Sequence, residues 1–134
     1  MPILVVGEKE IDCELVVFDK DGTLLDQFQS FLIRASARRK AICQYSSEKE
    51  ASQWERIAGI DLKRRWIDQE GPIATLPLKE EILIAALCFY LTNHSWEDAR
   101  QLAKLAYDTA ERSLVPPSNL VVFPGIRRKL AALK

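Results

Sequence analysis

The chain has 134 residues, of which 48% are hydrophobic, and its 19 basic side chains are balanced by 19 acidic ones. This length suits one ordinary domain, and the apolar content is typical of a packed globular protein. The zero net charge excludes a global electrostatic attraction to nucleic acid or to an anionic membrane surface, so neither is expected as a partner.

The apolar runs and the cysteines indicate where the protein resides. The longest apolar run, residues 82–91, is too short to span a bilayer. The cysteines Cys13, Cys43 and Cys88 are odd in number and widely spaced, without the paired spacing of a metal site. We therefore expect reduced, mostly buried thiols in a cytoplasmic protein.

Two extended segments are predicted near the amino end. Residues 3–6 are a short β-branched run, and the turn-forming residues 7–10 lead towards a second apolar run at residues 15–18. Four consecutive apolar residues are typical of a strand that is buried on both faces. We therefore expect a core strand at residues 15–18 with a hairpin at its edge.

Two carboxylates follow the expected core strand. Asp19 and Asp21 are two positions apart, so both can point into the crevice at the carboxyl end of the strand, where open parallel sheets bind ligands. Gly22 then allows a sharp turn of the backbone. A plain structural hairpin is an alternative reading of Asp21 and Gly22, but it leaves Asp19, Thr23 and Asp26 unexplained.

Two further classes of acidic loop are excluded by single positions. A calcium loop needs acidic ligands where this chain has Val17 and Phe28. The P-type ATPases carry a similar string, but with Thr at the position of Asp21 and within a protein that spans the membrane.

The string DKDGTLLD at residues 19–26, directly after a hydrophobic run, resembles the first signature motif of the haloacid dehalogenase-like (HAD) hydrolases. Most members of that family are magnesium-dependent phosphatases. The motif covers eight residues, and the helical stretch behind it is similar to the inserted cap of the phosphoglycolate phosphatase group. The resemblance implies an α/β fold, with a HAD-like Rossmannoid core and an inserted α-helical cap.

The resemblance also implies a role for each motif residue. Asp19 would be the nucleophile that forms an aspartyl-phosphate, and Asp21 would protonate the leaving group and then activate water. The Mg²⁺ cofactor would contact the Asp19 carboxylate and the backbone carbonyl of Asp21. Lys20, Gly22 and Thr23 would bind the phosphate of a small phosphorylated substrate, with the turn amides as a small anion nest.

The first predicted helices follow the motif directly. Asp26 with Gln29 has the pattern of a capping box and predicts a helix to about residue 45. Residues 46–47 can cap a second helix, which Gly59 ends.

The next part of the chain contains three more predicted segments. Asp61 predicts a third, short helix that carries Leu62, Trp66 and Ile67, and residues 69–77 have no helical pattern. Residues 79–92 are apolar nearly all round, which predicts a central, buried helix.

The last long helix is predicted to begin at Ser95, which with Asp98 forms another capping box. Small residues recur along one face of this helix, which suits close packing against neighbours.

Beyond residue 115 the helical pattern breaks, and the chain is expected to return to the core. Residues 120–123 are extended and apolar, residues 124–125 form a turn, and residues 126–133 begin an amphipathic helix. We therefore expect three parts: the start of the core with the catalytic Asp motif at 1–26, the helical cap at 27–117, and the return to the core at 118–134.

The family's later motifs, a phosphate-binding Ser or Thr, a Lys and further Asp residues, cannot be placed in these 134 residues. A lone strand that is buried on both faces also cannot complete its ladder. We therefore expect the amino-terminal part of a longer hydrolase, with only the first strand and edge hairpin of the core. On its own it would be inactive, and its motif strand would self-associate or pair with the missing carboxyl-terminal core.

Two alternatives for function stay open at this point. A sugar phosphomutase of the same family shares both aspartates, and a non-catalytic helical interaction module needs neither. Arg34 and Arg38, one turn apart on the first predicted cap helix, are candidates for binding a substrate anion, although such arginines are often paired on a surface.

Overall fold

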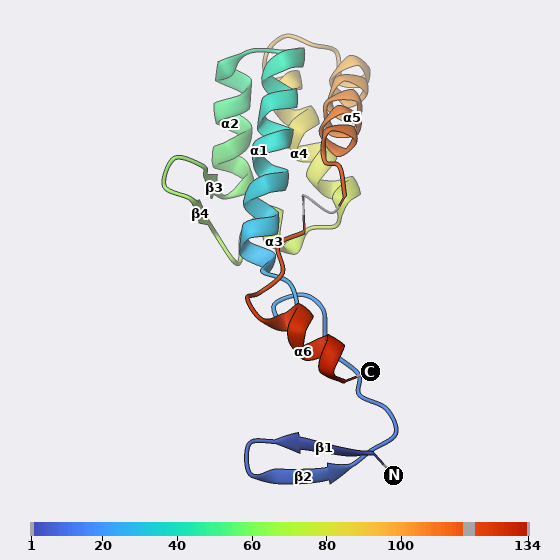
Figure 1. Cartoon of the computed structure of the whole chain (residues 1–134). Helices are drawn as coiled ribbons and strands as arrows, with labels where there is room; N and C mark the ends of the chain where they lie inside the picture. Colours follow the sequence, from blue (N-terminus) through green and yellow to red (C-terminus); the bar gives the residue numbers. More distant parts are fainter. Residues whose placement is uncertain (1, 117–119, 134) are drawn as a thin grey trace.

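The computed structural model describes residues 2–116 and 120–133, in which a bundle of long helices stands apart from a small hairpin and a short helix (Figure 1). In chain order the elements are β1 (Ile3–Val6), β2 (Lys9–Asp12), α1 (Gln27–Tyr45), α2 (Glu48–Ala58), β3 (Ile60–Asp61), β4 (Trp66–Ile67), α3 (Pro72–Thr75), α4 (Leu78–Tyr90), α5 (Trp96–Ser113) and α6 (Ile126–Ala132). The fold therefore combines helices with two small antiparallel hairpins, β1–β2 and β3–β4.

The four long helices form a closed ring. Helix α1 packs against α2 and α5, and α4 packs against the same two helices. Figure 1 shows that the chain alternates in direction from each helix of the ring to the next, which is the simplest topology of a four-helix bundle.

The predicted helix boundaries at α1, α2 and α5 are confirmed by their caps. The side chains of Asp26, Ser47 and Ser95 each accept a hydrogen bond from an amide in the first turn of their helix. Gly59 ends α2 with φ of 78°, a left-handed conformation that glycine adopts without strain.

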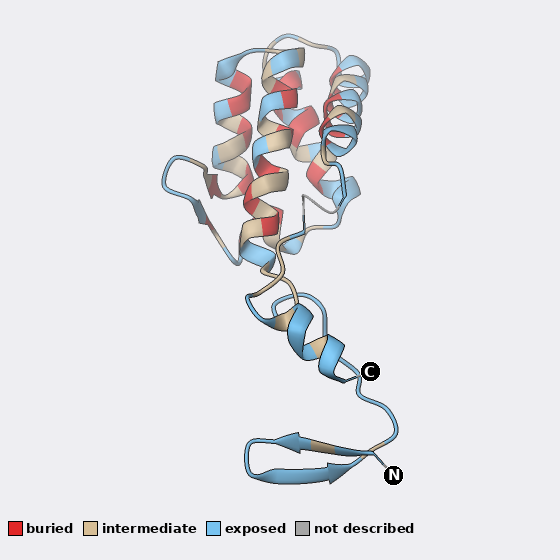
Figure 2. Ribbon diagram, viewed as in Figure 1, coloured by how far each residue is buried: buried red, intermediate tan, exposed pale blue. Residues whose placement is uncertain are grey.

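Aromatic side chains fill the centre of the ring. Trp54 and Tyr107 are fully buried and meet edge to face, with ring centroids 6.5 Å apart. The Trp54 Nε1 donates to the Tyr107 hydroxyl at 3.1 Å, so neither polar atom is left unpaired. Figure 2 shows the buried residues on the inward faces of the bundle, where the alanines of α5 allow close approach.

The expected third helix at Asp61 is wrong, because residues 60–67 form the hairpin β3–β4. Ile60 pairs with Ile67, and both side chains are buried. The Asp61 carboxylate accepts the amide of Arg64 at 2.9 Å, and Arg65 takes a left-handed φ of 52°. The Asp61 side chain, which could have capped a helix, thus stabilises the turn between β3 and β4.

The expectation that the helix at 79–92 is buried all round is also wrong. Helix α4 buries one face, with Ala85, Cys88 and Phe89, and leaves Leu83 and Leu87 exposed. A helix at a corner of a four-membered ring has only two neighbours, so its outer face stays open. In addition, the segment predicted to lack helical pattern contains the short helix α3.

The expected core strand at residues 15–18 is not formed. Among the residues that the structure describes, no segment pairs with it, and Val17 is 82% exposed. Strands β1 and β2 pair only with each other, and α6 buries none of its residues. A buried strand needs neighbours on both edges and cover on both faces, and the described residues supply neither.

The segments that lead into and out of the bundle are hydrogen-bonded to each other. The Asp26 amide donates to the Val121 carbonyl at 2.7 Å, and the Phe123 amide donates to the Leu24 carbonyl at 3.1 Å. Leu25 and Val122 form an antiparallel bridge between these bonds. We call this pair of segments, residues 24–26 and 121–123, the linker ribbon.

Helix length and apolar content bear on membrane insertion. Within the described residues, none of the helices combines the length and the apolar character needed to cross a bilayer.

Candidate active site

The residues of the acidic motif fold into a compact turn. The Lys20 carbonyl accepts the amides of both Leu24 and Leu25 at 3.0 Å, and the Gly22 amide donates to the Leu25 carbonyl at 3.0 Å. Gly22 has a φ of +79°, which an L-residue adopts only with strain. The linker ribbon holds the far end of this turn, so the turn is tied to the base of the bundle.

Within the turn, Asp19 and Thr23 are in contact. The Thr23 Oγ1 donates to the Asp19 Oδ2 at 3.2 Å, and the side chain of Asp19 is exposed. This bond orients the carboxylate and leaves its second oxygen open to solvent. A carboxylate that is held by one oxygen and free at the other is geometrically suited to attack an incoming electrophile.

Asp21 lies on the outside of the same turn. Its Oδ1 is 3.8 Å from the Lys20 Nζ, and both side chains are more than half exposed, so this ion pair contributes little to stability. Residues 19–23, which the motif predicts for the site, are consecutive in the chain, and the side-chain contacts among them are Asp19 with Thr23 and Lys20 with Asp21.

Two oxygen atoms of the turn are of the type that binds Mg²⁺. The free Asp19 oxygen and the Asp21 carbonyl are hard donors of the kind that Mg²⁺ prefers. No group of three or more acidic, histidine or cysteine side chains that could hold a metal gathers anywhere in residues 2–116 and 120–133. Two such oxygens would leave most of the coordination of a magnesium ion to water and substrate oxygens.

Arg38 lies inside the bundle and not at the turn. It is 4% exposed, its Nη1 donates to the Glu81 Oε2 at 2.5 Å, and its Nη2 donates to the Glu111 Oε1 at 3.2 Å. The guanidinium also lies 4.9 Å from the centre of the Tyr107 ring. Both terminal nitrogens are engaged with helices α4 and α5, which argues against the expected substrate-binding role of Arg38.

Arg34, one turn earlier on α1, is in a different situation. Its guanidinium lies 5.7 Å from the centre of the Phe31 ring, and its Nε, like that of Arg38, is buried without a hydrogen-bond partner among the described residues. Burial raises the pKa of the nearby Glu81 carboxyl, while the positive charges of Arg38 and Arg34 oppose that rise. Arg34 thus has no ion pair in the described part of the chain, whereas Arg38 has two.

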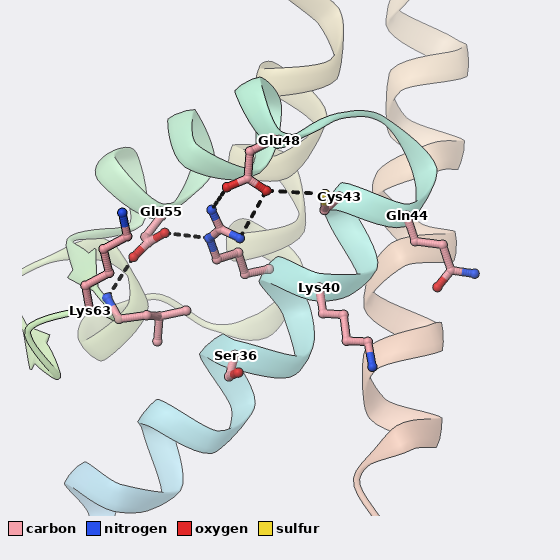
Figure 3. Close-up of a pocket in the computed structure, with 9 residues that line it drawn as sticks. Ser36, Lys40, Cys43, Gln44, Glu48, Glu55 and Lys63 are labelled. Carbon is pink, nitrogen blue, oxygen red and sulfur yellow. Dashed lines mark hydrogen bonds and ion pairs between the residues drawn. The ribbon is translucent and has the colours of Figure 1, made fainter.

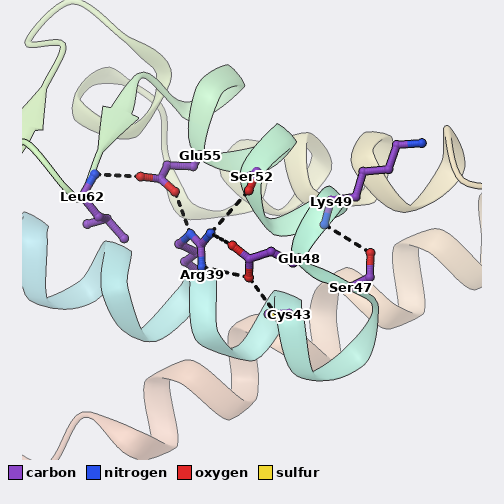
Figure 4. A network of polar contacts seen from close by, with 8 residues as sticks. All are labelled: Arg39, Cys43, Ser47, Glu48, Lys49, Ser52, Glu55 and Leu62. Carbon is purple, nitrogen blue, oxygen red and sulfur yellow. Dashed lines mark hydrogen bonds and ion pairs between the residues drawn. The ribbon is translucent and has the colours of Figure 1, made fainter.

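A second polar cluster was not found from the sequence. It lies between α1 and α2, beside a surface groove of about 720 Å³ that is lined by residues of both helices and the β3–β4 loop (Figure 3). Arg39 bonds to Glu48 and Glu55, and the other oxygen of Glu55 accepts the Leu62 amide at 2.7 Å (Figure 4). The sequence pattern that could have predicted this cluster is the spacing of Glu48, Ser52 and Glu55, which places all three on one face of a helix.

The chemistry of this cluster is structural. Hydrogen bonds from Arg39 lower the pKa of Glu48, and the same carboxylates raise the pKa of Arg39. Desolvation and the hydrogen bond to Glu48 raise the pKa of the Cys43 thiol, which keeps it protonated and poorly nucleophilic. The cluster therefore ties α1, α2 and the β3–β4 hairpin together.

Comparisons with protein-family models, with curated proteins and with solved structures find no match to this chain.

Proposed function

We propose that residues 19–23 are the nucleophile end of a Mg²⁺-dependent phosphate monoester hydrolase that acts on a small phosphorylated metabolite. The observation that carries the proposal is the Asp19–Thr23 contact within the Gly22 turn, because it presents an oriented, solvent-open carboxylate two residues from a second one. The resemblance of residues 19–26 to the first HAD motif supports the same chemistry.

The proposal includes the architecture that the resemblance implies. Residues 1–26 and 118–134 would belong to a HAD-like Rossmannoid core, and the helical bundle would be the inserted cap. The linker ribbon supports this division, because an inserted unit requires that its two ends leave the host side by side. Its bonds join Leu24 to Phe123 and Asp26 to Val121.

In the proposed reaction, Asp19 attacks phosphorus through its free oxygen, and the bond from phosphorus to the ester oxygen breaks as the aspartyl-phosphate forms. Asp21 gives a proton to the leaving oxygen, so that the product is a neutral alcohol. Water then attacks the aspartyl-phosphate and loses a proton to Asp21, which returns both carboxyl groups to their starting states and releases phosphate.

The surrounding groups bind and orient the substrate. Thr23 fixes the Asp19 carboxylate, and the Lys20 ammonium favours a bound anion, whereas the Gly22 amide is engaged with the Leu25 carbonyl and shapes the turn. Mg²⁺, held by the Asp19 carboxylate and the Asp21 carbonyl, would neutralise phosphate charge when bound. Arg34 is the candidate for an anionic group elsewhere on the substrate, since it forms no ion pair among the described residues and only its longer-range charge acts on Glu81.

The test is phosphate release from a panel of small phosphate monoesters by the protein as its gene encodes it. We expect release that requires Mg²⁺ and stops on chelation with EDTA. Analysis of products separates the enzyme alternatives, because an isomeric sugar phosphate without free phosphate would identify a mutase. No reaction with any ester of the panel, with Mg²⁺ present, would favour a non-catalytic helical module.

Asp21→Asn tests the proton donor. We expect turnover of alkyl phosphates to fall by roughly 10²–10⁴-fold, because a poor leaving group needs a proton, while an activated aryl phosphate loses much less. The measurement is kcat for both substrate types with the wild-type protein and the variant. Equal losses on the two substrate types would remove Asp21 from this role.

A further inference from the structure

Helix α4 carries an apolar surface patch on the side that faces away from the core. Leu83, Leu87 and Tyr90 lie at the i, i+4 and i+7 positions of one face, and Leu91 and Trp96 extend it beyond the end of the helix. Tyr90 and Trp96 meet edge to face at 5.8 Å, so the far end of the patch is a rigid aromatic pair. We call these five residues the α4 patch.

The size of the α4 patch sets it apart from scattered exposed leucines. Its five side chains are each between 41% and 56% exposed. Together they present on the order of 400–500 Å² of apolar surface, which is within the range of the largest patch on a typical monomer, and such patches are often functional. Two such patches face to face, with their polar rims, approach the roughly 1,200 Å² at the low end of specific interfaces.

The arrangement of the leucines is self-complementary. Leu83, Leu87 and Leu91 are evenly spaced along one side of α4, so a two-fold axis at Leu87 places Leu83 of each copy against Leu91 of the other. The two α4 helices then run antiparallel, which sets their dipoles in opposition and is favourable.

Charges at the two ends of the patch fit the same arrangement. Lys79, at the amino end of α4, has no ion pair among the described residues. Glu97, at the opposite end of the bundle, accepts a hydrogen bond from Gln101 at 3.2 Å, and its ion pair with Arg100 is 4.0 Å long. An antiparallel pair brings Lys79 of one copy beside Glu97 of the other, at both ends of the interface.

We propose that two copies of this chain associate through the α4 patch, with antiparallel α4 helices and a two-fold axis at Leu87. This interface is independent of the turn at Asp19, which belongs to the segment between β2 and α1, outside the helical bundle (Figure 1). An interface of this area lies at the low end for specific complexes, so we expect a dimer that forms in a concentration-dependent way.

Sedimentation equilibrium of the wild-type chain from about 1 to about 100 μM measures this association. We expect a monomer–dimer equilibrium, and we expect Leu87→Glu to raise the dissociation constant at least about 100-fold, because two carboxylates would meet at the axis. Leu105→Glu is the matched control, since Leu105 is 46% exposed on α5, outside the patch. Circular dichroism and thermal unfolding check that both variants fold.

A charge exchange tests the orientation. Lys79→Glu should weaken the dimer several-fold, and adding Glu97→Lys should restore it, because the pair is reformed with its signs reversed. A wild-type chain that stays monomeric at about 100 μM would overturn the proposal. So would a dimer that survives Leu87→Glu but dissociates on Val17→Glu, because the exposed segment at residues 15–18 would then be the interface.

Discussion

Asp19→Asn is expected to abolish phosphate release, with a loss in kcat of about 10⁴-fold or more. An amide oxygen is a far weaker nucleophile than a carboxylate, and the variant therefore loses the covalent step itself. The fold should be unchanged, because Asp19 is exposed and its only hydrogen bond among the described residues is accepted from Thr23. The measurement is kcat with Mg²⁺ on the best ester of the panel, together with the thermal unfolding midpoint.

Asp26→Asn is the matched control in the same motif. Asp26 caps α1 by accepting the Gln29 amide at 3.1 Å, and asparagine is an equally good capping residue. Its activity and stability should therefore stay close to those of the wild-type protein. An Asp19→Asn variant that retains activity within a few-fold of the wild type would show that Asp19 is not the nucleophile.

Arg38→Met is expected to lower the free energy of unfolding by about 3–5 kcal/mol. Arg38 and Glu81 are both buried between α1 and α4, and removing the cation leaves the Glu81 carboxylate without its partner. Chemical denaturation at neutral pH measures the loss. Arg100→Met is the control, because Arg100 is exposed and its contact with Glu97 is 4.0 Å long.

The stability of the Arg38→Met variant should depend on pH in a definite direction. In the wild-type protein, burial raises the pKa of Glu81 above the ordinary carboxyl value of 4.5, and Arg38 opposes the rise. Without Arg38 the pKa rises further, so above pH 4.5 the folded state keeps a proton that the unfolded state loses. The variant should therefore lose stability as the pH rises through this window and be closest to the wild type in acid.

A double variant distinguishes the loss of the whole Arg38–Glu81 ion pair from the loss of one partner alone. Arg38→Met combined with Glu81→Leu removes both charges and should recover most of the lost stability, because apolar residues of similar volume replace a buried pair well. If Arg38→Met unfolds like the wild type at neutral pH, the pair does not hold α1 to α4.

Local capping chemistry made the helix boundaries predictable. Asp26, Ser47 and Ser95 each stand before an amphipathic run, and each caps the helix expected there. The turn at Asp19 was predictable for the same reason, since Gly22 and the spacing of its neighbours act over a few residues.

Features that depend on distant partners were not predictable. Asp61 precedes a short apolar pattern that suits a helix, but Ile60 and Ile67 are buried together only once α2 and α3 are in place, and this favours a hairpin. The composition of α4 is compatible with burial on every side. Which of its faces is exposed depends on the packing of all four helices into a closed ring, and the sequence of α4 alone does not determine this. Arg34 and Arg38 have the same sequence context, yet only Arg38 meets the carboxylates of α4 and α5.

The linker ribbon has a consequence for how this chain could change over evolution. Because Leu24–Asp26 lies against Val121–Phe123, everything between them is a branch that starts and ends at one point. The entropy of closing a chain segment grows only slowly with its length, so the branch can gain or lose whole helices at little cost to the segments that hold it. A graft of another helical unit, or of a short turn, onto residues 26 and 121 would leave the geometry at the Asp19 turn in place.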